Sequence, residues 1–128
     1  FRNAWLAKRS EKDIGRYLTL VADSERTAFG PHGVDLSTTV TAAGRYRVSV
    51  QMVYGPAQGV IQLYDNDQPS GNEIDTYAPA RRKGELTYLT TVNLAEGENV
   101  IRLKLVRKNP ASSRLAFDLM QVVLERER

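Results

Sequence analysis

The 128-residue sequence contains no cysteine, one histidine and no long apolar segment. Without cysteine the chain can form no disulfides, CxxC redox centres or thiolate metal sites. No apolar run approaches the ~18 residues that a membrane-spanning helix requires. The single imidazole belongs to His32 in the sequence GPHG, which predicts a solvated turn, so neither a Ser-His-Asp nor a Cys-His arrangement is expected. These scarcities predict no catalytic residues and no membrane partner.

Neither positive nor negative charge is concentrated in one part of the chain. The formal net charge is +3, but basic and acidic residues are interleaved and do not form blocks. Nucleic acid is therefore not an expected partner. Hydrophobic residues make up 41% and charged residues 26%, as in ordinary globular proteins. We expect one domain over residues 1–128, with residues 1–13 as a lead-in segment, excised from a longer protein because the chain begins at Phe1.

The segment 44–64 shows the pattern typical of half-buried strands. Apolar and aromatic side chains occupy every second position of its first half, at Tyr46, Val48, Val50, Met52 and Tyr54. Gly55 and Pro56 then interrupt the run, and an extended pattern resumes over 60–64. The sequence here predicts a hairpin of two paired strands.

Similar extended segments follow one another at roughly 8–12-residue spacing, which favours a β-sandwich or barrel. They cover residues 14–22, 34–41, 44–54, 60–64, 73–77, 85–94, 99–106 and 115–124. Turn-forming residues predict exposed loops at 23–33, 65–72, 78–84 and 108–114. Residues 1–13 fit either a helical turn or an extended lead-in. The residues expected to share one core are Val48, Val50, Ile61, Leu63, Ile101, Leu103, Leu105, Phe117 and Val122.

Five segments spread over residues 43–117 also show a family pattern. They are AGRYRVSV at 43–50, GVIQLY at 59–64, IDTYAP at 74–79, TTVNLAEGENVIRLKLV at 90–106 and KNPASSRLAF at 108–117. Their order and spacing resemble the galactose-binding-like jelly rolls, which include carbohydrate-binding module families six and thirty-five of bacterial glycoside hydrolases. The resemblance implies an all-β jelly-roll β-sandwich of about eight antiparallel strands.

The same resemblance implies a function. It suggests a non-catalytic carbohydrate-binding-like accessory module of an exported bacterial hydrolase, secreted or periplasmic, that binds an oligo- or polysaccharide and contacts neighbouring domains of a larger chain. The alternative is a structural or oligomerisation module without sugar affinity, whose exposed apolar face would lie around Trp5 and Leu6.

Many modules of this kind hold a structural calcium ion with an aspartate in the last strand and a glutamate near the start. In this sequence the corresponding position of the last strand is Met120, and the nearest carboxylate is Asp118. A thioether is a soft ligand that calcium does not favour. The sequence therefore predicts no cofactor and no metal site, and makes the structural calcium of the family doubtful.

A sugar site needs an aromatic face for the apolar C–H side of a pyranose and planar polar groups for its hydroxyls. The wider set of candidates comprises Trp5, Tyr54, Tyr64, Tyr77, Tyr88, Asn66, Asp75, Arg81, Arg82 and Asn109. Those closest to predicted loops, and hence expected to bind ligand, are Tyr54, Tyr64, Asp75, Tyr77 and Asn109.

Two charged clusters could form a catalytic or binding site, but each is more simply interpreted as part of a turn or loop. Asp65 and Asp67 could act as a carboxylate pair or bind a hard cation, but Asx side chains at such spacing are typical of turns. The run Arg81-Arg82-Lys83 could contact an acidic sugar or a phosphate, although a solvated loop that protects an edge strand is the preferred interpretation.

Overall fold

The computed structural model describes residues 4–22, 26–27 and 30–127, and within these ranges it is built of ten β-strands and no helix. The strands are β1 (Ala4–Glu11), β2 (Gly15–Ala22), β3 (Arg26–Thr27), β4 (Gly30–Val40), β5 (Gly44–Tyr54), β6 (Val60–Asp65), β7 (Gln68–Asp75), β8 (Arg82–Leu94), β9 (Gly97–Arg107) and β10 (Leu115–Arg126). The all-β prediction is confirmed, with ten strands where about eight were expected. No helix in these ranges is long and apolar enough to span a membrane.

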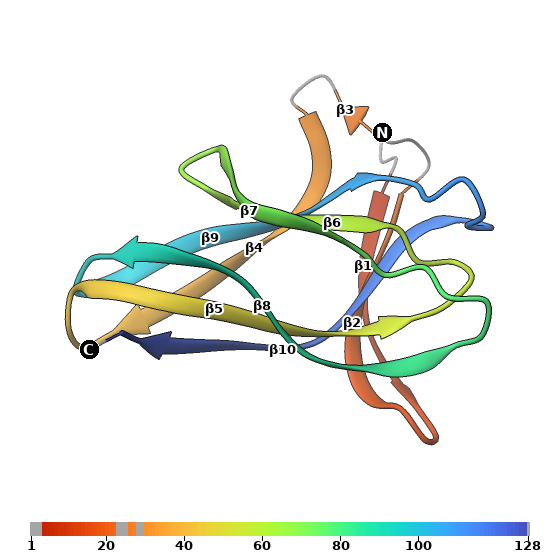
Figure 1. Cartoon of the computed structure of the whole chain (residues 1–128), viewed down its shortest axis with the longest axis horizontal. Helices are drawn as coiled ribbons and strands as arrows, with labels where there is room; N and C mark the ends of the chain where they lie inside the picture. The colour runs from red at the N-terminus through yellow and green to blue at the C-terminus, as the bar shows by residue number, and fades with distance from the viewer. Residues whose placement is uncertain (1–3, 23–25, 28–29, 128) are drawn as a thin grey trace.

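The strands form two five-stranded antiparallel sheets that pack face to face as a β-sandwich. The first sheet has the order β1-β2-β10-β5-β8, and the second has the order β3-β4-β9-β6-β7. Figure 1 shows β6, β7 and β9 of the second sheet above β5 and β10 of the first. From β4 to β10 the chain changes sheet at every connection except the β6–β7 hairpin.

The predicted hairpin between β5 and β6 is therefore wrong. β5 pairs on its two sides with β10 and β8, whereas β6 pairs with β7 and β9 in the other sheet. Residues 55–59 cross between the layers, and this crossing is held by hydrogen bonds from Gly55 N–H to the Thr76 carbonyl (3.2 Å) and from Gly59 N–H to the Ala116 carbonyl (2.8 Å). Alternation of side chains shows which face of a strand is buried, but it does not identify the neighbouring strand.

The predicted core is confirmed. Between the two sheets, eight of the nine expected side chains are buried and Val122 packs partly buried against them. Phe117 of β10 and Leu103 of β9 are completely inaccessible to solvent. The core is contributed by the inward faces of both sheets, as the alternation within each strand requires.

The predicted solvated turn at His32 is also wrong. The sequence GPHG forms the start of β4, where His32 lies opposite Leu105 of β9 and is only 8% exposed. Proline is accepted there because it lies at the start of the strand, and pairing with β9 supersedes the local turn preference. The predicted loop 23–33 also includes residues outside the described ranges.

Two other predicted loops are shorter than expected. In the loop 65–72 the turn is confined to Asn66 and Asp67, whose φ angles are 50° and 63°, and β7 begins directly afterwards. Short Asx side chains tolerate this left-handed conformation. The loop 78–84 ends at Arg82, where β8 begins.

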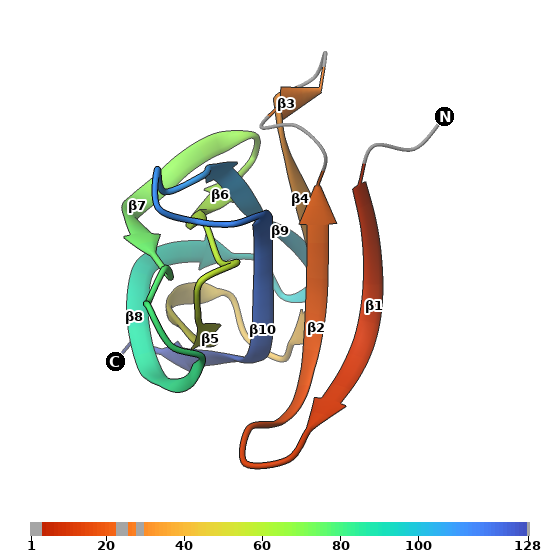
Figure 2. The same cartoon turned by 90° about the vertical axis from the view of Figure 1, so that its right-hand side faces the viewer.

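The residues expected as a lead-in, over 4–11, form strand β1, which pairs with β2 in a hairpin. Figure 1 shows the tip of this hairpin extending beyond the other strands. β10 pairs with β2 over Leu115–Leu119 and with β5 from Asp118 onward, with a register shift at Met120. Such a bulge bends a strand, and Figure 2 shows β10 running beside β2 before it turns away.

Candidate functional site

The structure brings three of the five predicted site residues together at the end of β7. The Asp75 carboxylate accepts a hydrogen bond from the Tyr77 backbone N–H at 3.0 Å and another from the Asn109 side-chain amide. The Asn109 side-chain oxygen in turn accepts from the Ala111 N–H at 2.8 Å. These polar groups join two loops to each other. Their role in binding a sugar stays a prediction.

Tyr54 and Tyr64, the other two predicted residues, lie on different sheets. The guanidinium of Arg82 lies 4.4 Å from the ring centre of Tyr54, and the Lys104 ammonium lies 4.3 Å from that of Tyr64. These are cation–π distances, so one face of each ring already contacts a positive charge. A sugar stacking on that face would first have to displace the cation.

Tyr64 also lines a small hollow of about 160 Å³ on the outer face of the second sheet. Arg102 contributes to its wall and forms ion pairs of 2.6 Å with Asp35 and with Asp67. Because this guanidinium is already paired with two carboxylates, it offers little to a ligand. The hollow is too small to enclose much of a sugar ring and its neighbours.

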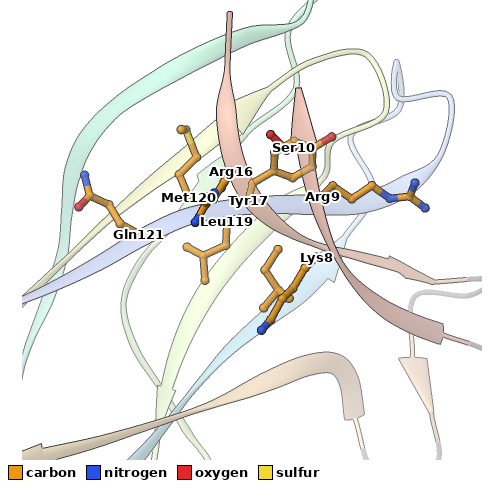
Figure 3. Close-up of a pocket in the computed structure, with 9 residues that line it drawn as sticks. Lys8, Arg9, Ser10, Arg16, Tyr17, Leu119, Met120 and Gln121 are labelled. Atoms are coloured by element: carbon orange, nitrogen blue, oxygen red, sulfur yellow. The ribbon is translucent and has the colours of Figure 1, made fainter. Parts of the chain in front are cut away.

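A larger hollow, of about 640 Å³, opens between the β1–β2 hairpin and the bulge of β10 (Figure 3). None of its residues was selected as a binding residue from the sequence. They are Lys8, Arg9, Ser10, Arg16, Tyr17, Leu18, Leu119, Met120 and Gln121. Three strands contribute to it, and we refer to this site as the hairpin hollow.

The register between the strands determines which side chains line the hairpin hollow. Lys8 lies opposite Leu18, Ser10 lies opposite Arg16, and Leu18 lies opposite Leu119, so these five side chains share one face of the sheet. Further along β2 this face becomes the core. Near the tip of the hairpin it instead carries exposed polar residues beside apolar ones.

The hairpin hollow thus has an apolar floor and a polar rim. Leu119 is buried, while Leu18 and the bulged Met120 are half-buried. At the rim, the Gln121 side-chain amide donates a hydrogen bond to the Gln51 side chain at 2.8 Å, which orients its remaining polar atoms. On the other side of the hollow, the exposed hydroxyl of Ser10 belongs to β1. Such a combination can contact the C–H face of a ring and bind its hydroxyls.

A charge cluster on the other face of the hairpin holds this arrangement in place. Arg81 Nη2 lies 2.8 Å from the Glu11 carboxylate and 2.7 Å from Asp118, and its Nε lies 2.9 Å from both Glu11 oxygens. The Tyr17 hydroxyl donates to Glu11 at 2.6 Å, and the Gln58 amide donates to Asp118 at 3.2 Å. The cluster joins both hairpin strands, β10 and two loops, and we call it the Arg81 cluster.

This finding corrects the interpretation of Arg81-Arg82-Lys83 as a solvated loop. Lys83 is exposed, but the Arg81 side chain is only 30% exposed and the carboxylate side chain of Asp118 only 5%. Hydrogen bonds from Arg81, then from Tyr17, lower the pKa of Glu11, so this carboxylate is charged at neutral pH. Burial, followed by the hydrogen bond to Glu11, raises the pKa of the Tyr17 phenol. The pKa of Arg81 is raised by its hydrogen bond to Glu11.

The Arg81 cluster also bears on the calcium that the family resemblance implies. Glu11 near the start and Asp118 in the last strand are the carboxylates closest to that requirement, and the Arg81 guanidinium already lies between them. A divalent cation would have to displace this positive charge. No group of three or more potential metal-binding His, Cys, Asp or Glu side chains occurs in the described part of the chain. The residues present therefore do not fit a calcium ion.

We expect the thermal stability of the protein to be independent of calcium. A bound ion would stabilise the folded state in proportion to the logarithm of its concentration, by about 2.7 kcal/mol at a hundred times its dissociation constant. Melting temperatures measured by scanning calorimetry with EDTA and with millimolar CaCl₂ should agree. A clear rise with CaCl₂ that MgCl₂ does not reproduce would contradict this prediction.

Comparisons with known proteins place the chain in a family. Residues 22–127 match the family model described as Domain of unknown function (DUF8441). The chain belongs to this family. In this DUF8441 protein the match begins at the last residue of β2, so the hairpin that forms one side of the hollow precedes the matched region. No curated protein matches the sequence.

Two solved structures share the fold of the DUF8441 protein. A Paenibacillus xanthan lyase is similar over 96% of this chain, with a TM-score of 0.79 and 20% sequence identity. A Podospora anserina GH26-CBM35 β-(1,4)-mannanase is similar over 99% of the chain, with a TM-score of 0.59 and 14% identity. The chain spans only 12% and 25% of the lengths of these two proteins. At these low sequence identities, the similarity shows that the β-sandwich fold is shared.

Proposed function

We propose that the chain is a non-catalytic carbohydrate-binding module of a larger secreted or periplasmic hydrolase, and that it binds an oligo- or polysaccharide. The observation on which this rests is the hairpin hollow, with its apolar floor and polar rim. The similar structures add support, because both are enzymes named for a polysaccharide and this chain matches only a small part of each.

The chemistry of the hollow favours binding over hydrolysis. Its lining residues include neither a carboxylate nor an imidazole, so it offers no acid/base pair. Leu18, Leu119 and Met120 can contact the C–H face of a pyranose ring. Ser10 and Gln121 can exchange hydrogen bonds with its hydroxyls. Because few side chains take part and the hollow is open to solvent, the affinity should be modest.

The alternative of an interaction module without sugar affinity has its own support. Leu86 and Tyr88 are exposed by 49% and 46% and lie on β8, an edge strand. Leu6, expected in such a face, is 47% exposed, and the side chain of its partner Trp5 lies outside the described residues. An exposed apolar group on a sheet edge can pack on a neighbouring domain or on a second copy.

A glycan array followed by titration calorimetry tests the proposal. We expect at least one oligosaccharide to bind, and Gln121→Ala to weaken its binding several-fold to tenfold, since one hydrogen bond contributes about 0.5–1.5 kcal/mol. Gln68→Ala, an exposed glutamine on β7 of the other sheet, is the matched control and should bind normally. Tyr77→Ala tests the Asp75 loops in the same assay.

Two results would contradict the proposal in different ways. If no glycan bound up to millimolar concentration and light scattering showed a stable oligomer, the interaction module would replace it. If Tyr77→Ala abolished binding while Gln121→Ala did not, the sugar site would lie at the Asp75 loops instead of the hairpin hollow.

A further inference from the structure

On the side of its apolar floor, the hairpin hollow carries two positive charges that no carboxylate of the described residues neutralises. Lys8 and Arg16 are exposed, and neither has a carboxylate oxygen within 4.0 Å in the ranges that the structure describes. Elsewhere on the sandwich, carboxylates do pair with five arginines, namely Arg45, Arg47, Arg81, Arg102 and Arg107.

Both charges belong to the face that forms the hollow. Lys8 lies opposite Leu18, and Arg16 precedes Leu18 by two positions on β2, so both side chains emerge on the side of the apolar floor. Figure 3 shows Arg16 directed toward Leu119 and Met120, whereas the neighbouring Arg9 extends away from them. Arg9 also lines the hollow, but Lys8 and Arg16 are the cations on the side of the apolar floor.

The acidic groups of the hairpin do not compensate these charges. Glu11 lies one position from Ser10 and thus on the opposite face, where it is bound to Arg81 and Tyr17. Asp13 lies in the turn at the tip, with a φ of 70°. The lining of the hollow itself contains no acidic residue. Its local charge is therefore positive.

We infer that the hairpin hollow selects sugars that carry a carboxylate, a conclusion that rests on the proposed carbohydrate-binding function. Arg16 can form a bidentate pair with a carboxylate, and Lys8 adds a second charge. The apolar floor distinguishes this ligand from a small inorganic anion. A sulfate or phosphate ion has no C–H face for Leu18, Leu119 and Met120 to contact, whereas a uronic acid residue has both a carboxylate and such a face.

Selectivity is the measurable consequence. An acidic sugar gains charge-assisted hydrogen bonds that its neutral counterpart lacks, and exposed Lys8 and Arg16 stay hydrated when a neutral sugar binds. We expect uronate-containing oligosaccharides to bind about tenfold more tightly than the same oligosaccharides with their carboxyl groups reduced to alcohols. This difference should shrink as NaCl rises from 20 to 500 mM, because salt screens such exposed charges.

Charge-matched variants locate the selectivity. The double variant Lys8→Gln with Arg16→Gln should bind acidic oligosaccharides no better than the reduced ones. The control, Lys83→Gln with Lys108→Gln, removes the same net charge from two exposed lysines outside the hollow and should retain the preference. Both pairs are on the surface, so circular dichroism should show unchanged folding.

The two methionines provide a direct probe of the location. Met120 lines the hollow, whereas Met52 is buried in the core and is 2% exposed. In protein labelled with ¹³C at the methionine methyl groups, sodium glucuronate should shift the Met120 signal and leave Met52 unchanged. Glucose should shift the Met120 signal less, and sodium sulfate at equal ionic strength should not reproduce the effect.

The outcomes separate this inference from the proposed function. Binding of neutral oligosaccharides as tightly as acidic ones would overturn the inference and leave the function standing. An equal effect of sulfate on Met120, acidic binding without a Met120 shift, or loss of selectivity only in the lysine control would also overturn it. If neither acidic nor neutral glycans bound at all, the proposed function itself would fail, and the inference with it.

Discussion

Replacing Arg81 with methionine is expected to lower the free energy of unfolding by about 3 kcal/mol, because removing one partner of a buried ion pair leaves the other charge uncompensated. The buried partner is Asp118, for which the described residues would then supply only the hydrogen bond from Gln58. Glu11 is more exposed and loses less. Urea unfolding followed by circular dichroism at pH 7 measures the change.

The neighbouring Arg82 provides the control. Its guanidinium contacts the Tyr54 ring and no carboxylate within 4.0 Å in the described residues, so Arg82→Met should cost about 1 kcal/mol or less. Adding Asp118→Asn to Arg81→Met should restore part of the lost stability, because it removes the unpaired charge. Equal losses for the two arginine variants, with no recovery in the double variant, would show that the ion pairs contribute nothing specific.

The Arg81 variant should also affect ligand binding. The cluster joins Glu11 at the end of β1 to Asp118 of β10, and these strands form opposite sides of the hairpin hollow. Without Arg81, the described part of the chain would hold β1 to the sandwich through its pairing with β2. A module with a less fixed hairpin has to order it on binding, and this ordering reduces affinity. The cluster thus connects the stability of the fold with the shape of the proposed site.

The sequence predicted the strands well because alternation of side chains is a local property. Val48, Val50 and Leu103 occupy the inward positions that the pattern indicated. Pairing was predicted less well, because the neighbours of a strand are determined by the whole sandwich. The alternation in 44–54 and 60–64 cannot show that these strands face each other across the core instead of pairing edge to edge.

The same difference between local pattern and long-range pairing applies to the site residues. Asp75 and Tyr77 were expected at the end of a strand over 73–77, beside the loop 78–84, and the structure places Asp75 at the end of β7 with Tyr77 just beyond it. The hairpin hollow depends instead on the register between β1 and β2 and on an extra residue at Met120. One signal was present: Arg16 continues the apolar face of Leu18 with a charge, which indicates that this face leaves the core.

Truncating Leu103 to alanine is expected to lower the free energy of unfolding by about 2–5 kcal/mol, through lost apolar contacts and the cavity left behind. Leu103 lies on β9 between Val34 of β4 and Leu63 of β6, at the middle of the second sheet, and is inaccessible to solvent. Flanking strands on both sides hold the backbone, so the cavity cannot easily collapse.

A second leucine makes the experiment a matched comparison. Leu86→Ala removes the same atoms from an exposed position on β8, and we expect it to cost less than about 0.5 kcal/mol. Urea unfolding should show a lower midpoint for Leu103→Ala with an unchanged slope, since a smaller slope would indicate a change in compactness instead of a loss of packing. Equal midpoints for the two variants would mean that the two sheets do not enclose a common core at Leu103, and the sandwich described here would have to be abandoned.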